Sequence, residues 1–308
     1  MYANSIVRME KKAVVNKLKK SIDRTFLNVF LYALMAEVLN KGLTAGYSLL
    51  SGHSEYMTKD FGFILMIAFA APVIFILYRG VRYENLALKE KIAGESNMTV
   101  GRLILMLTLL LGVGIASSLI TSIGEYTVSR FGLTVMNDSE WAKGESITTV
   151  SLIIYGTIVG PIAEELMFRG YVLGKLKKHG EFFAIVASAL IFGAFHGNVI
   201  QLVHAGLAGI IYGFVASRYG VKWSIALHIF NNGIWGQGMT VLIILTKSEV
   251  LGLIHTLLPI FAFFISIIYL FLNRKKVAGY IKRNKSNASL FYAVTSVWCI
   301  AVVILRFM

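Results

Sequence analysis

The sequence reads Glu164-Glu165-Leu166-Met167-Phe168-Arg169 within a run that is otherwise apolar enough to cross a bilayer. A charged side chain inside a membrane is costly, so ionisable residues there mark a functional site whose partners have to be found. On a helix, Glu165 and Arg169 stand at i and i+4 and can pair on one face. Glu164 lies about 100° around the helix and cannot share that partner equally well. The stretch therefore predicts one neutralised, supporting carboxylate and one that needs another partner.

The composition is that of a polytopic membrane protein. Of the 308 residues, 56% are hydrophobic and only 15% are charged, whereas a soluble domain has roughly 25% charged residues. Apolar stretches of about 20 residues, each long enough for a membrane-spanning helix, recur along the chain. We therefore expect an all-α transmembrane bundle of about eight to nine spans around a polar intramembrane cavity. The net charge of +14 fits basic cytoplasmic loops better than a nucleic-acid partner.

The predicted domain organisation is a basic amphipathic segment, 1–25, followed by a single membrane domain, 26–308, with its catalytic core at about 147–245. Pro161 is expected to kink the long helix that carries the carboxylates. The predicted spans are 26–50, 62–82, 103–123, 147–177, 182–196, 200–217, 222–245, 251–272 and 288–306.

Basic residues alternate between the loops of this predicted topology. The N-terminus and the loop 273–286 are rich in Lys and Arg, whereas the loop 124–146 is acidic. The positive-inside rule then predicts a cytoplasmic N-terminus in a plasma membrane, with 124–146 outside. The N-terminal segment is expected to lie on anionic membrane lipid. The oligomeric state is left open.

Three further polar residues in apolar segments are candidates for the site. His196 and Glu164 each lie roughly 20 Å from the cytoplasmic ends of neighbouring helices, so they can face each other. His228 and Asn232 stand at i and i+4 and project from one helix face, although residue counting places His228 at a shallower depth. Asn231 is expected to point elsewhere.

These groups could hydrolyse a peptide bond. Glu164 with His196 could activate a water, and His228 with Asn232 could stabilise the oxyanion of a tetrahedral intermediate. His-Glu-x-x-His is absent, but Glu164, His196 and His228 could still hold zinc as a two-His, one-carboxylate set. The residues alone do not decide between a metal-independent hydrolase and a zinc-dependent one.

Three motifs resemble those of the CPBP family of CAAX proteases and bacteriocin-processing enzymes, also called the Abi family. They are E-E-L-M-F-R at 164–169, F-x-x-x-H from Phe192 to His196, and H-x-x-x-N from His228 to Asn232. The resemblance implies an intramembrane endopeptidase with a water-filled cavity open to the cytoplasm. It further implies that Glu164 and His196 activate water, that His228 and Asn232 form the oxyanion site, and that no metal cofactor takes part. Phe192, like Glu165 and Arg169, is expected to support the catalytic site structurally.

The resemblance implies a membrane-associated substrate without identifying it. Family members cleave prenylated CAAX proteins, process bacteriocin leaders or signalling peptides, or confer immunity, so a peptide or a lipidated protein is expected. The alternatives are a catalytically silent immunity or scaffold protein and a proton-coupled transporter, in which Glu and His would form a relay. We find no internal repeat of the kind common in transporters.

Overall fold

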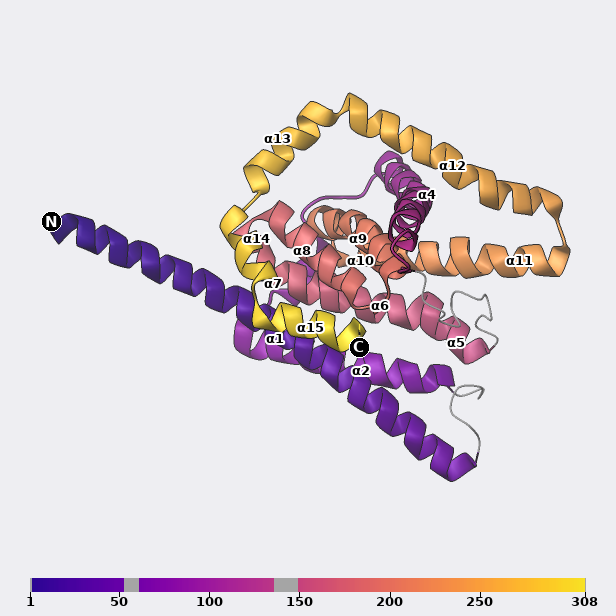
Figure 1. Ribbon diagram of the computed structural model, residues 1–308, viewed down its shortest axis with the longest axis horizontal. Coiled ribbons are helices and arrows are strands. Elements are labelled where there is room, and N and C mark those ends of the chain that lie inside the picture. Colours follow the sequence, from indigo (N-terminus) through magenta and orange to yellow (C-terminus); the bar gives the residue numbers. More distant parts are fainter. Residues whose placement is uncertain (1, 53–60, 136–148, 308) are drawn as a thin grey trace.

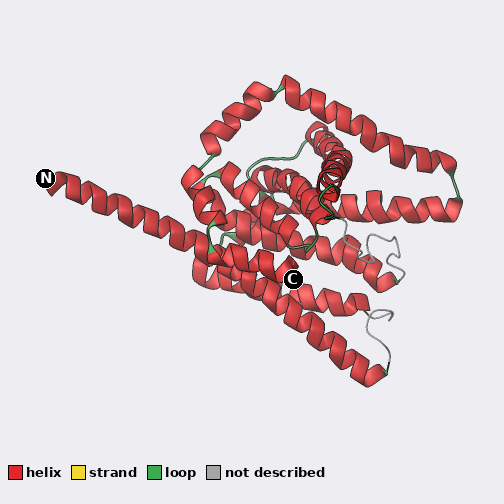
Figure 2. Ribbon diagram, viewed as in Figure 1, coloured by secondary structure: helices red, strands yellow, loops and turns green. Residues whose placement is uncertain are grey.

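The computed structural model describes residues 2–52, 61–135 and 149–307, with side chains from residue 13 onward. Within these ranges every regular element is a helix (Figure 2). In chain order they are α1 Tyr2–Ser51, α2 Phe61–Glu84, α3 Leu88–Ala93, α4 Val100–Ser129, α5 Val150–Ile154, η1 Tyr155–Val159, α6 Gly160–Glu165, η2 Leu166–Leu173, α7 Gly174–Leu176, η3 Lys177–His179, α8 Glu181–Ala194, α9 Val199–Tyr219, α10 Val221–Ile229, η4 Phe230–Gly238, α11 Met239–Thr246, α12 Glu249–Leu272, α13 Arg274–Asn284, α14 Asn287–Val294 and α15 Val297–Phe307.

The chain is an integral membrane protein. In the part that the structure describes, six helical stretches are long and apolar enough to cross a bilayer, and they are Ala13–Ser51, Phe61–Glu84, Val100–Ser129, Val150–His179, Val199–Tyr219 and Glu249–Leu272. Helices α14 and α15 form a seventh if they count as one span, although they are bent by 50°. α1 runs without a break through the predicted boundary at residue 25.

The predicted eight to nine spans therefore exceed the six to seven candidates. Two predicted spans account for the difference. The stretch 182–196 becomes α8, whose 14 residues are too few for a hydrocarbon core. The stretch 222–245 becomes α10, η4 and α11, where two asparagines, a glutamine and several glycines dilute the apolar residues.

The helix that carries the carboxylates is continuous over 30 residues, Val150–His179, which confirms the predicted long helix. It is not a regular α-helix, because η1 and η2 are π-helical segments on either side of α6. Pro161 has no N–H to donate and stands at the start of α6, directly after the first π segment. The predicted kink at Pro161 stays a prediction, whereas the π-helical segments on either side of α6 are of a type that often occurs at functional sites.

This helix lies at the centre of the bundle. η2 contacts α2, α8 and α9, while α1 packs against α2 and α15 on one side and α4 packs against α9 and α12 on the other (Figure 1). Asn198 caps the N-terminus of α9, and its Oδ1 accepts a hydrogen bond from the Gln201 N–H at 2.8 Å. Gly220 follows the last residue of α9, and there φ is +97° and a Cβ would lie 2.4 Å from the carbonyl oxygen of Ile92. Only glycine fits there, so the chain reverses sharply into α10.

Candidate active site

Glu165 and Arg169 form the predicted pair and are completely buried. Arg169 Nη1 donates to Glu165 Oε1 at 2.9 Å, and neither side chain has exposed surface. Arg169 Nη2 donates to the Gly209 carbonyl at 3.3 Å, and its guanidinium lies 4.2 Å from the Phe192 ring centroid. A Cβ at Gly209 would lie 2.9 Å from that nitrogen. The absence of a side chain at this position of α9 lets the guanidinium reach the backbone.

Glu165 has a second partner, His228, which the sequence did not indicate. His228 Nδ1 lies 3.0 Å from Glu165 Oε1. A carboxylate oxygen only accepts, so Nδ1 carries a proton and Nε2 is the nitrogen left to face the rest of the site. Tyr212 stacks on the imidazole with centroids 4.8 Å apart. The buried carboxylate and the tyrosine together fix the position and tautomer of His228.

Asn232 stands one turn beyond His228 on the same helix. Its Nδ2 lies 3.3 Å from His228 Nε2 and 3.4 Å from the Gly156 carbonyl oxygen. Asn231 donates from Nδ2 to Asn232 Oδ1 at 3.0 Å and lines the same cavity. The prediction that Asn231 points elsewhere is therefore wrong. Both asparagines lie in the π-helical segment η4, where neighbouring residues turn through a smaller angle than in an α-helix.

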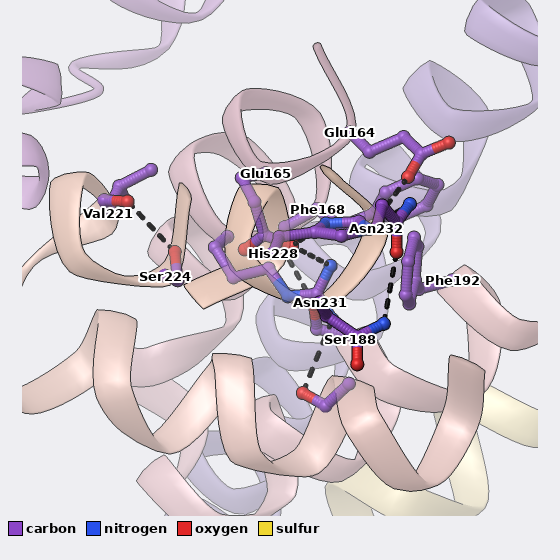
Figure 3. Close-up of polar contacts among 12 residues, drawn as sticks. Glu164, Glu165, Phe168, Ser188, Phe192, Val221, Ser224, His228, Asn231 and Asn232 are labelled. Carbon is purple, nitrogen blue, oxygen red and sulfur yellow. Dashed lines mark hydrogen bonds and ion pairs between the residues drawn. The ribbon is translucent and has the colours of Figure 1, made fainter. Parts of the chain in front are cut away.

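Glu164 differs from Glu165 in its exposure and its partner. Its side chain is 21% exposed, whereas that of Glu165 is 0% exposed. Glu164 Oε2 lies 3.7 Å from His228 Nε2, and the two form an ion pair when both ring nitrogens of His228 are protonated (Figure 3). In the described part of the chain, no hydrogen bond joins Glu164 directly to His196. Glu164 thus has room for a water molecule, which Glu165 lacks.

His196 lies in the short turn between α8 and α9. Its Nδ1 is 3.0 Å from the carbonyl oxygen of Phe192, which can only accept. Nδ1 therefore holds the proton and Nε2 is free to accept a hydrogen bond. The Phe192 ring meets His196 edge-on at 5.0 Å and His228 edge-on at 5.8 Å. Phe192 thus contacts both histidines and the guanidinium of Arg169.

A cavity of about 150 Å³ brings together three of the four residues predicted to be catalytic, and Glu164 is not among its lining residues. Its lining includes His196, His228, Asn231 and Asn232 from three segments of the chain. One face of α9 completes the wall with residues that recur at helical spacing, and these are Gln201, His204, Ala205, Ala208 and Tyr212. A helical wheel drawn from His204 would have revealed this face, including Gln201 and Tyr212.

His204 has a partner outside the predicted set. Its Nδ1 lies 3.1 Å from the hydroxyl of Ser117 on α4. The sequence offered no acidic partner for this histidine, and a hydroxyl 87 positions away could not be anticipated from spacing. The contact anchors the cavity wall to α4.

The residues proposed for a metal do not converge on one position. Among the described residues, no group of three or more His, Cys, Asp and Glu side chains is placed to hold a metal ion. The set of Glu164, His196 and His228 therefore does not fit a two-His, one-carboxylate site in this arrangement.

The fold and site define a polytopic helical membrane protein with a buried carboxylate–histidine cluster. Residues 146–234 match the model of the type II CAAX prenyl endopeptidase Rce1-like family. A curated relative from Bacillus subtilis (strain 168), named "Putative membrane peptidase YdiL", is 35% identical over 122 residues. The alignment spans 39% of this chain and 47% of that protein. No solved structure matches the chain.

Proposed function

We propose that this protein is an intramembrane endopeptidase that hydrolyses a peptide bond of a membrane-associated peptide or protein. One observation carries the proposal: His196, His228 and Asn232 line one cavity, beside the partly exposed carboxylate of Glu164. The family match over 146–234 supports the same reaction class, since it covers all four residues. CAAX-type processing, maturation of a bacteriocin or signal peptide, and immunity are all compatible with this chemistry.

In the proposed reaction, Glu164 takes a proton from a water that also donates to Nε2 of His196. The resulting hydroxide attacks the carbonyl carbon, and the carbonyl oxygen becomes an oxyanion. Asn232 Nδ2 and His228 Nε2, which are 3.3 Å apart, then donate to that oxyanion. In this mechanism His228 enters the reaction as an imidazolium, with one proton on each ring nitrogen, and Glu165 at 3.0 Å balances its charge. Glu164 finally returns its proton to the leaving amine as the C–N bond breaks.

A cleavage assay on the purified full chain tests the proposal. Quenched peptides that end in a CAAX sequence, with and without a farnesyl group, and quenched leader-type peptides are incubated with wild type and with Glu164→Gln. Cleavage by wild type alone supports the proposal. Equal signals from the two proteins on every peptide would contradict it and favour a silent scaffold or immunity protein.

Asn232→Ala is expected to lower kcat by about 10²–10³, because that is the usual cost of losing one oxyanion donor. KM should change far less. Gln201→Ala is the matched control, since Gln201 lines the same cavity and no hydrogen bond of its side chain is found among the described residues. Asn231 is unsuitable as a control because it donates to Asn232. A variant that kept its kcat and lost only affinity would show that Asn232 binds substrate instead.

Activity is expected to survive a strong chelator, because the described site lacks a convergent metal-ligand set. The measurement is turnover before and after dialysis against the chelator, together with the zinc content of the purified protein. Loss of turnover that zinc alone restores would instead support a zinc site formed by Glu164, His196 and His228.

We further propose that the protein resides in a bacterial plasma membrane with its N-terminus and α13 in the cytoplasm. In a Cys299→Ala background, a membrane-impermeant maleimide added to intact cells should label Leu133→Cys, after α4, and spare Lys276→Cys, in α13. Both positions are exposed. Labelling of both positions, or of Lys276→Cys alone, would contradict this orientation.

A further inference from the structure

A second, larger cavity lies at the C-terminal end of the long helix 150–179, and neither Glu164 nor Glu165 lines it. It measures about 900 Å³, and its walls come from α1, the corner after α2, the α7–η3 end and the region around α14 (Figure 1). Ser21 and His179 Nε2, 2.9 Å apart, join α1 to η3 across it. The basic residues of its lining are Lys17, Lys20, Arg24, Lys175 and Lys178, together with His179. Among the described lining residues, Glu84 alone is acidic.

That carboxylate is already engaged by its own neighbours. Lys175 Nζ lies 3.3 Å from Glu84 Oε2 and 2.6 Å from the Glu84 carbonyl oxygen. Tyr171 donates to Oε2 at 2.9 Å, and Asn28 donates to Oε1 at 3.0 Å. Glu84 therefore compensates Lys175 and has little capacity left for the other cations of the cavity.

The remaining cations of the cavity are not directly paired with a carboxylate in the described part of the chain. Lys17, Lys20, Arg24 and Lys178 form no ion pair there. The three residues of α1 stand at i, i+3 and i+7, so they share one face and repel one another. Five Lys and Arg residues against one carboxylate leave a formal charge of +4 around the cavity. Such a concave basic surface attracts anions strongly.

The position of the cavity favours a lipid as the anion. Lys175 follows Glu164 by 11 residues in one continuous helix, which places it roughly 16 Å further along the axis. This is the depth of a headgroup if Glu164 lies within the hydrocarbon. Val14 and Leu18 add apolar surface to the lining. Basic pockets between the ends of membrane helices are typical sites for anionic headgroups.

We propose that this cavity binds the phosphate-bearing headgroup of an anionic phospholipid. Lys17, Lys20, Arg24 and Lys178 donate to the phosphate oxygens, and the first acyl carbons lie along Leu18. The site is separate from the catalytic cavity, and the inference does not depend on cleavage activity.

The test measures binding of short-chain phosphatidylglycerol to the delipidated full chain in neutral detergent. Lys17→Gln/Arg24→Gln is expected to weaken this binding about 30-fold, because each basic side chain near a lipid phosphate contributes a factor of about five. The matched control is Lys275→Gln/Lys276→Gln, which removes the same charge from exposed positions of α13 outside the cavity. The control should retain wild-type affinity.

Two further measurements distinguish a lipid headgroup from a soluble phosphate as the bound anion. Short-chain phosphatidylcholine should bind at least tenfold more weakly than phosphatidylglycerol, and inorganic phosphate should not displace the lipid at equal concentration. Displacement by phosphate would overturn the lipid proposal in favour of a soluble phosphate ligand. Equal loss of binding in the control would overturn it too, because the effect would then arise from overall surface charge.

Discussion

Glu164→Gln is expected to abolish peptide cleavage while the protein keeps its fold. The substitution preserves the shape of the side chain and removes the oxygen that accepts the proton. General-base catalysis typically contributes a factor of about 10²–10⁴ to the rate, so kcat should fall by a factor of at least about 10². Glu164 is 21% exposed and its ion-pair partner is 3.7 Å away, so stability depends little on its charge. The measurements are single-turnover cleavage and the melting temperature in detergent.

The adjacent carboxylate provides the internal comparison. If Glu164→Gln still cleaved the peptide and Glu165→Gln folded without cleaving it, the general base would be Glu165 and not Glu164. If both variants lost cleavage but only Glu165→Gln had a lower melting temperature, the results would support Glu164 as the catalytic carboxylate and Glu165 as the supporting one.

Glu165→Gln is expected to destabilise the protein strongly. It leaves the fully buried guanidinium of Arg169 without its counter-charge and removes the charged acceptor of His228 Nδ1. Breaking one side of a buried ion pair costs about 3–5 kcal/mol, which is a large part of the stability of most domains. Folded yield and melting temperature should both fall, and cleavage should fall with them because His228 loses its orientation.

Glu37→Gln is the matched control for that experiment. Glu37 Oε1 lies 3.0 Å from Lys41 Nζ, and their side chains are 31% and 76% exposed. Glu37 Oε2 also lies 3.5 Å from Arg306 Nη1, which is 19% exposed. Exposed pairs contribute about 1 kcal/mol or less. A Glu165→Gln protein that melted no lower than Glu37→Gln would show that the buried pair is not a stabilising element.

The sequence predicted the elements that depend on local pattern. The i,i+4 pair of Glu165 and Arg169, the continuous helix through Lys177 and most of the span positions follow from residue spacing and apolar length. Spacing also selected His196, His228 and Asn232, which line one cavity. Their catalytic roles stay predictions until the variants are measured.

The sequence could not predict where helices depart from regular geometry or how they pack. The π segments η1, η2 and η4 shift side chains relative to α-helical counting, so Asn231 and Asn232 line the same cavity. Counting residues also placed His228 at a shallow depth, yet its imidazole contacts Glu165 at 3.0 Å. Contacts such as Ser117 with His204 depend on tertiary packing and leave no local signal.

The shortness of α8 determines how far the turn that carries His196 reaches into the membrane. A helix of 14 residues extends about 21 Å, whereas the hydrocarbon core is about 30 Å thick. Ten of the 14 residues of α8 are buried, so other helices of the protein, and not lipid, surround most of its surface. If α8 starts at one interface, the His196 imidazole lies inside the hydrocarbon core, and water that reaches it has to come through the protein.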